Sequence, residues 1–205
     1  MALLILLTAS CQQQHSAQQE ATQALEELRA LITEQNYKEL GFESLAELSE
    51  MVLDTPLPVY QIGLSDLKDF ERGQDPNTLL GEAHEMLYPI TVHGQRRSSV
   101  GVKKSGGGWE VASFGRAKLV RKLGQVRAQH ARANNRDPAD YFVVQIPSIY
   151  LIFLGHRVEG NLMLTHIHDQ DDFDFEAGVT EAGHELIARI LPVVKEHEGA
   201  LTSTP

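Results

Sequence analysis

The sequence predicts an α+β protein with N-terminal helices and antiparallel β-meanders that are each followed by a helix. Three observations support this class. Apolar residues recur at helical spacing near both ends, over 20–34 and 180–196. Two groups of short β-rich segments, at 88–114 and 141–168, are punctuated by turn residues, and a basic amphipathic helix at 116–133 separates them. Strands joined by tight turns pair antiparallel, which argues against a doubly wound parallel sheet.

The folded body should begin with two helices. Over 20–34, apolar residues return every three or four positions and charged residues lie between them. Ser44 and Glu47 have the spacing of a capping box, which predicts a second helix running to Met51. We therefore expect a helical hairpin at the start of the body.

Short elements lead from this hairpin to the first meander. Residues 59–62 have the β-branched and aromatic content of a strand. Residues 64–70 predict a short helix with Ser65 as its N-cap. Residues 79–86 are expected to form one more helix.

The first meander should contain three strands. Residues 88–92 and 97–103 flank a His-Gly pair that suits a tight turn. Residues 109–114 pair back across the segment 105–108, which contains three glycines. These glycines lie between two strands and lack P-loop spacing, so a hairpin turn is expected there and not a phosphate cradle.

The second half repeats the order of strands followed by a helix. The segments Val59–Ile62 and Val143–Ile146 also resemble each other, so a duplicated unit with halves 20–136 and 137–205 is possible. In the last helix, Pro192 should kink the chain or end its regular part. The elements expected in this half are the helix 116–133, the strands 141–146, 149–154 and 162–168, and the helix 180–196.

Charge is distributed very unevenly along the chain. The 205 residues contain 28 acids and 18 bases, a net charge of −10, which argues against a general nucleic-acid binder. From Arg96 to Arg136, however, eleven bases accompany a single acid, Glu110, so this segment carries +10 and the rest −20. The basic segment could bind an anionic ligand, an envelope protein or anionic lipid, or it could be neutralised by the protein's own acids. The candidate residues are Arg96, Arg97, Arg116, Lys118, Arg121 and Lys122.

The N-terminus contains an apolar run that ends in small residues and the only cysteine, Cys11. The sequence Leu-Thr-Ala-Ser-Cys at 7–11 resembles the lipobox of bacterial lipoproteins. The resemblance implies a signal peptide at 1–10 and a diacylglycerol on Cys11 that inserts into the membrane. The alternative is a buried apolar strand with an ordinary free cysteine.

Residues 11–19 are polar and without apolar periodicity, so they predict a flexible tether before the α+β body at 20–205. By the same resemblance, Gln12 after the lipidated cysteine favours the outer membrane, with the body facing the periplasm. After removal of the signal peptide, the protein would keep two features that point to the cell envelope, the lipid anchor and the basic segment.

The densest group of potential metal ligands begins near the end of the last predicted strand. On a strand, His166 and His168 would point to the same face and could bind Zn²⁺, with Asp169, Asp171 or His184 completing the site. The acids alone could attract Ca²⁺, although they lack the EF-hand pattern. The alternative is a strand end with exposed histidines next to a solvated acidic loop.

No motif of a known catalytic type is present in the sequence. There is no Gly-x-Ser-x-Gly elbow, and His184-Glu185 is not followed by the second histidine of a zinc protease. We therefore expect a lipid-anchored, non-enzymatic envelope module that binds through its basic surface. The alternative is a metal-binding protein or metal-dependent enzyme centred on His166 and His168.

Overall fold

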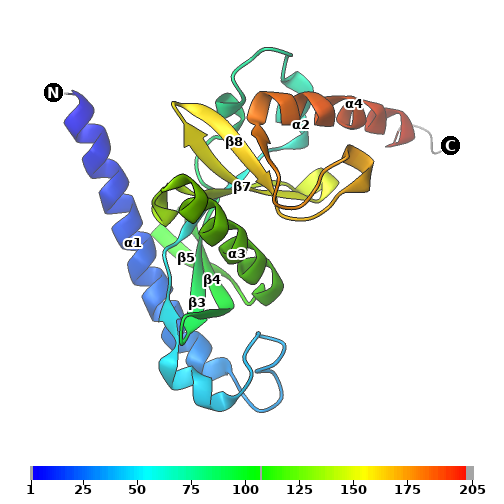
Figure 1. Ribbon diagram of the computed structural model, residues 1–205. Coiled ribbons are helices and arrows are strands. Elements are labelled where there is room, and N and C mark those ends of the chain that lie inside the picture. Colours follow the sequence, from blue (N-terminus) through cyan, green and yellow to red (C-terminus); the bar gives the residue numbers. More distant parts are fainter. Residues whose placement is uncertain (1, 107, 202–205) are drawn as a thin grey trace. The chain divides into compact units, whose positions relative to one another are not determined.

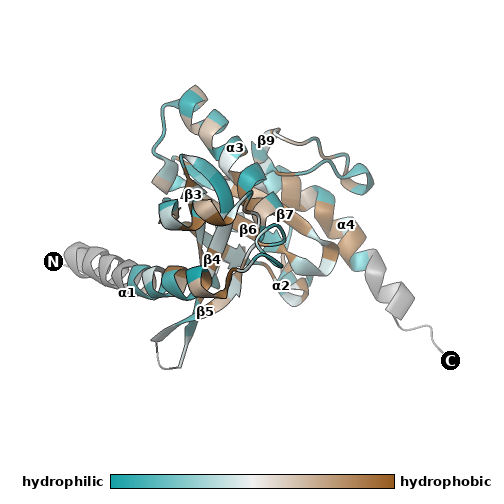
Figure 2. Cartoon of the chain, turned by 90° about the horizontal axis from the view of Figure 1, so that it is seen from below, coloured by the Kyte–Doolittle hydropathy of each residue, from teal (hydrophilic) through white to brown (hydrophobic). Residues whose placement is uncertain are grey.

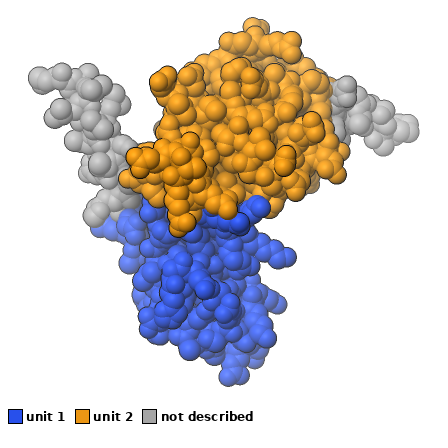
Figure 3. All heavy atoms as spheres, in the orientation of Figure 1, with its two compact units in different colours: residues 1–58, 84–125 blue, residues 59–83, 126–205 orange. Residues whose placement is uncertain are grey.

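The computed structural model describes the backbone of residues 2–106 and 108–201, and the side chains of residues 17–106 and 108–195. Its helices and its mixed parallel and antiparallel strands confirm the α+β class (Figure 1). The chain divides into two compact units (Figure 3). Unit 1 contains residues 1–58 and 84–125, and unit 2 contains residues 59–83 and 126–205.

Unit 1 is built around an antiparallel meander that the sequence predicted correctly. Hydrogen bonds join β3 to β4 and β4 to β5, and His93 and Gly94, both with positive φ, form the first turn. A short strand, β1, pairs antiparallel with β3. The elements of this unit are α1 (Ala2–Leu31), the 3₁₀ helix η1 (Leu45–Glu50), β1 (Val52–Leu53), β3 (Glu85–Val92), β4 (Gln95–Ser105) and β5 (Gly108–Phe114).

Helix α1 covers the meander and begins earlier than predicted. It packs against β4 and β5, and Figure 1 shows it lying along these strands. Ala17, Ala21 and Ala24 are fully buried in the core of the unit, with Leu28 one turn further on. The small alanine side chains let the helix approach the sheet closely. The boundary predicted at residue 20 is therefore at least three residues too late.

Two other local predictions for this part of the chain are wrong in part or entirely. The second helix of the expected hairpin lies at the predicted place, with Ser44 as its N-cap residue, but it is a 3₁₀ helix and not an α-helix, and the Ser44 side chain makes no capping hydrogen bond. Glu47, expected in the capping box, instead accepts from the backbone N–H of Glu43 and pairs with Arg97. The helix expected at 79–86 is also wrong, because Glu85 already begins β3, where pairing with β4 overrides local helix propensity.

Unit 2 contains the second meander and the C-terminal helix. Strands β6, β7, β8 and β9 pair antiparallel in sequence order. Two elements cross the boundaries of the units, β2 (Leu57–Gln61) and α3 (Ala117–Asn134). The other elements are α2 (Leu64–Asp69), η2 (Pro76–Leu79), η3 (Pro138–Asp140), β6 (Phe142–Ile146), η4 (Pro147–Ile149), β7 (Leu151–Val158), β8 (Asn161–His166), η5 (Asp171–Phe173), β9 (Thr180–Ala182) and α4 (Gly183–Leu201).

Both meanders are antiparallel as expected, and one further strand pair is parallel. Strand β2 pairs with β6 in parallel, and the register aligns Val59 with Val143 and Gln61 with Gln145. These are the two segments whose sequences resemble each other. They lie side by side as neighbouring strands, and this pairing does not show a duplication. Residues 59–83 thus belong with the second unit, whereas the predicted halves placed them in the first.

Helices α2 and α4 contribute to the core of unit 2. Leu186, Ile187, Ile190 and Val194 form the buried stripe of α4, which Figure 2 shows as a largely hydrophobic helix. The helix continues past Pro192, so of the two outcomes expected there, a kink or an end of the regular part, the end does not occur. The predicted start was also early, because residues 180–182 form strand β9. Helix α2 is confirmed, but its N-cap is Gly63 and not Ser65.

Candidate functional site

The two arginines near the start of β4 are neutralised within unit 1. Arg97 forms ion pairs with Glu43 at 2.6 Å and Glu47 at 2.8 Å, and only 12% of its side chain is exposed. Arg96 pairs with Asp54 at 2.7 Å. Burial opposes the charge of Arg97, but the two glutamates outweigh it and raise the pKa of the guanidinium. These arginines therefore serve the fold and have little capacity left for an external anion.

Arg116 is also engaged by the protein's own acids. Its guanidinium lies 2.9 Å from the buried carboxylate of Glu85, which also accepts a hydrogen bond from Ser113 at 3.2 Å. Gly101 leaves room for this carboxylate, since a Cβ atom there would lie 1.7 Å from Glu85 Oε1. The pair stabilises a buried charge, so Arg116 is a structural residue.

The bases of α3 behave differently from those of β4. Lys118 and Arg121 are exposed and Lys122 is partly exposed. Within the described part of the chain, none of the three has an ion pair or a side-chain hydrogen bond. At the helical period, these bases and the exposed Gln125 fall within an arc of about 100°. We call these four residues the basic face of α3.

The structure thus separates the six predicted anion-binding residues into two groups. Arg96, Arg97 and Arg116 are held by acids of the same unit, whereas the bases of the basic face are not. Helix α3 contains no acidic residue that could reduce this local charge. The acids that neutralise the first group come from the segments 43–54 and 85, and the sequence could not show which acids these would be.

His166 is the most constrained histidine of the predicted metal group. It is 1% exposed, and its Nε2 lies 3.1 Å from Glu181 Oε1. Glu181 in turn pairs with Arg189 of α4. The imidazole packs against Phe175, with the ring centroids 4.2 Å apart, and against Phe153 at 5.4 Å.

Burial favours the neutral form of the His166 imidazole. Burial lowers the pKa of His166 and outweighs the opposing effect of Glu181. The hydrogen bond from Arg189 lowers the pKa of Glu181, so that carboxylate stays ionised. A carboxylate that orients a neutral imidazole is an arrangement that general bases use. Because His166 is almost completely buried, however, it cannot reach a substrate in this conformation.

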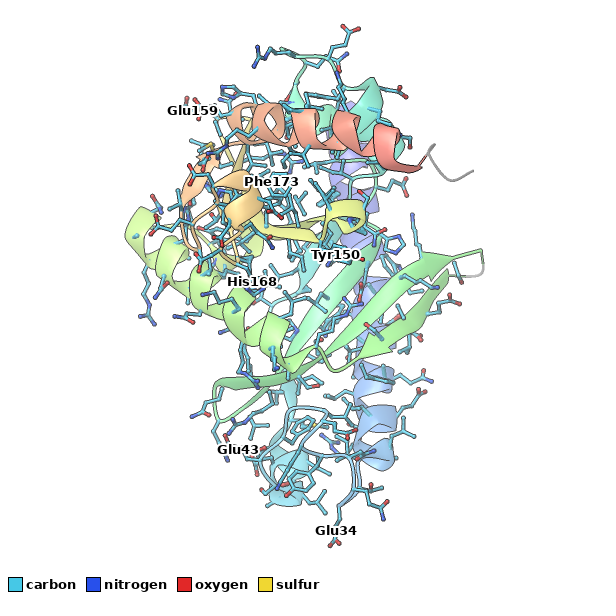
Figure 4. The ribbon with its side chains drawn as sticks, turned by 90° about the vertical axis from the view of Figure 1, so that its right-hand side faces the viewer. Glu34, Glu43, Tyr150, Glu159, His168 and Phe173 are labelled. Carbon is cyan, nitrogen blue, oxygen red and sulfur yellow. The ribbon has the colours of Figure 1, made fainter. Side chains whose placement is uncertain are left out.

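The expectation that His166 and His168 share one face is wrong. Strand β8 ends at His166, so the alternation of side chains does not continue through the next two residues. Ile167 is buried and His168 is exposed on the loop that follows, where it is labelled together with Phe173 (Figure 4).

The other three predicted ligands do not converge either. Asp169 accepts a hydrogen bond from the backbone N–H of Ala177 at 2.7 Å, which closes the loop between β8 and β9. Asp171 is exposed in η5, and His184 is exposed in the first turn of α4. Among the described residues, no group of three or more His, Cys, Asp or Glu side chains is arranged to hold a metal ion.

Sequence reasoning missed a second histidine cluster in unit 2. His130 Nδ1 lies 2.7 Å from the Tyr141 hydroxyl, and the rings of His130 and His156 lie 4.6 Å apart. His156 is 2% exposed, and its Nδ1 has no hydrogen-bond partner in the described structure. Burial, His130 and Arg136 together lower the pKa of His156 to about 4. The position of His156 inside an apolar strand was the only indication in the sequence.

Unit 2 also contains a cavity of about 430 Å³ next to α2. Its wall includes three carboxylates and two buried apolar side chains, and no base lines it. This cavity could not be predicted from a local sequence pattern, because its walls come from the end of β2, from α2, and from η2 with its flanking loops. The lining residues are Gln61, Asp66, Asp69, Phe70, Gln74, Thr78, Leu79, Gly81 and Glu82.

The predicted lipidation site, Cys11, lies outside the residues whose side chains the structure describes. Over the described residues, no helix combines the length and the apolar character that a membrane span requires. Comparisons with protein-family models, with curated proteins and with solved structures found no match.

Proposed function

We propose that this chain is a non-enzymatic binding module of the bacterial envelope, anchored by a lipid on Cys11, that binds an anionic partner through the basic face of α3. The observation that carries the proposal is the contrast between the two groups of bases. Arg96, Arg97 and Arg116 are engaged in ion pairs with acids of the same unit, whereas Lys118, Arg121 and Lys122 have no ion-pair partner in the described structure.

The net charge of the protein does not oppose this function. At physiological ionic strength, charges separated by more than about 8 Å are largely screened. A partner at the basic face therefore senses the bases of that face more than any acid of the chain that lies beyond this distance. Lys118, Arg121 and Lys122 have no ion-pair partner among the described residues, and α3 itself contains no acid, so these three bases favour an anion at this face.

A fluorescent polyglutamate peptide tests the binding function. Full-length Cys11→Ser protein is titrated into the peptide, so that acylation plays no part. We expect binding that weakens with salt and is lost when Lys118, Arg121 and Lys122 are all changed to Gln, without a change in the free energy of unfolding. Unchanged binding by this triple variant would contradict the proposal.

Arg116→Gln is the matched control. It also removes a base from the segment 96–136, but it leaves the buried carboxylate of Glu85 without its ion-pair partner. We expect this variant to lose stability while it keeps its affinity for the peptide. The lipid anchor is tested separately by mass spectrometry of the native N-terminus, where an unmodified Cys11 would refute the anchor alone.

A further inference from the structure

We infer that the anionic partner is a layer of phospholipid headgroups, onto which the basic face of α3 docks. The inference rests on the proposed function and names the partner of that same face. The basic face contains three bases, and no exposed large hydrophobic side chain of the described residues belongs to α3.

The basic face has no apolar anchor of the kind that protein interfaces use. Among the described residues, the exposed large hydrophobic side chains are Leu31, Leu45, Val52, Tyr150 and Val179, and none of them belongs to α3. Interfaces between proteins concentrate their binding energy in buried aromatic and apolar side chains surrounded by a polar rim. A face made of two lysines, an arginine and a glutamine cannot supply that core.

A headgroup layer makes no such demand on the surface. Long flexible lysine and arginine side chains reach phosphates that have no fixed positions, and each base near an anionic leaflet contributes about 1 kcal/mol. Electrostatic contact of this size is weak by itself but sufficient as the second signal of an anchored protein. A lipid on Cys11 would supply the first signal, since only five residues separate Cys11 from Ala17, the first buried residue of the core.

Charge complementarity also selects among lipids. The three bases favour phosphatidylglycerol, which carries a net negative charge, over phosphatidylcholine, which is neutral overall. Docking should therefore depend on the anionic lipid content and should weaken at high salt, as the screening length falls to about 3 Å at 1 M.

The experiment is vesicle flotation of the full-length Cys11→Ser protein. Phosphatidylcholine vesicles with and without phosphatidylglycerol are compared, with the triple variant Lys118→Gln, Arg121→Gln and Lys122→Gln. We expect the wild-type face to prefer phosphatidylglycerol and the triple variant to lose about 100-fold in partitioning, which corresponds to about 1 kcal/mol for each base.

A control of equal charge guards against a general effect of net charge. Lys38, Arg72 and Lys195 are exposed bases outside α3, and changing all three to Gln alters the net charge by the same amount. We expect this control to retain most of the partitioning. An equal loss in both variants, or no preference of the wild-type protein for phosphatidylglycerol, would overturn the inference.

The peptide and the vesicles together distinguish the two claims. Binding to polyglutamate through the basic face without binding to phosphatidylglycerol vesicles would overturn the lipid partner and leave the binding function standing. If neither probe binds, the basic face is not a binding surface and both claims fall.

Discussion

Acid should destabilise unit 2 through His156, and the structure gives the size of the effect. This imidazole is buried between His130 and Tyr141, and its Nδ1 lacks a hydrogen-bond partner within the described structure. A proton added to it would place a charge beside His130 and Arg136, with Asp140 as the opposing acid. We therefore expect replacement of His156 to make the protein less sensitive to acid.

The direction of the effect follows from proton linkage. The pKa of His156 is about 4 in the folded protein, against an ordinary value of 6.5. Between these values the unfolded chain binds a proton that the folded chain does not, so stability falls as the pH decreases from 6.5 to 4. The full shift corresponds to about 3 kcal/mol, and the loss between pH 7 and pH 5 to about 2 kcal/mol.

Urea unfolding of the wild-type protein and of His156→Leu, at pH 7 and at pH 5, measures this contribution. Other titrating groups are common to both proteins, so the difference between their pH dependences isolates the histidine. We expect the variant to lose about 2 kcal/mol less than the wild-type protein between the two pH values. His184→Gln, at an exposed position on α4, should behave as the wild-type protein does.

Equal losses of unfolding free energy by the wild-type protein and His156→Leu between pH 7 and pH 5 would refute a destabilising role of His156. A histidine titration followed by NMR provides an independent check. A resonance of His156 that titrates near 6.5 in the folded protein would show that the imidazole is hydrated or paired, contrary to its buried environment.

Three further predictions concern stability. Arg97→Met should lower the free energy of unfolding by about 2–3 kcal/mol, because it leaves the partly buried Glu47 without its cation. Urea unfolding measures this loss, and a change below about 0.5 kcal/mol would exclude a stabilising ion pair. Gly101→Ala should lower the free energy of unfolding by about 1–3 kcal/mol, because the added Cβ would meet Glu85. Gly81→Ala should be nearly neutral, because a Cβ there meets nothing within 4 Å. Equal thermal stability of the two variants would contradict this prediction. Leu186→Ala should cost about 2–5 kcal/mol in urea unfolding, since the side chain is fully buried in the core; a surface-like loss would place α4 outside it.

Local patterns predicted the elements that local interactions determine. The hairpin around His93 and Gly94 was predictable because its turn residues and the flanking alternation agree. Helix α3 followed from the spacing of its apolar residues, and it runs from Ala117 to Asn134, close to the predicted 116–133.

Long-range pairing explains most of what the sequence did not reveal. The parallel contact of Val59 with Val143 joins residues more than eighty positions apart, and no local pattern encodes such a partner. The strand at Glu85 is another example, because its partner strand overrides the helix propensity of its neighbours.

The candidate site could be predicted only in part, because long-range ion pairs decide which bases remain available. The excess of bases in 96–136 was visible in the sequence, but the acids that neutralise Arg97 and Arg116 come from Glu43, Glu47 and Glu85. The residues left over for binding could be identified only after those pairs were known. For His168, a strand that ended two residues early was enough to remove the predicted metal pair.

Each unit is built from two separate segments of the chain, so a single cut cannot separate the two units. The polypeptide passes from one unit to the other three times, at 58–59, 83–84 and 125–126. A truncation at a single point, such as 136, would separate β2 and α2 from the strands and helix with which they share a core. Neither unit can therefore be produced as a continuous fragment, and a protease cut in one connection should leave two pieces that remain associated and lose their structure together.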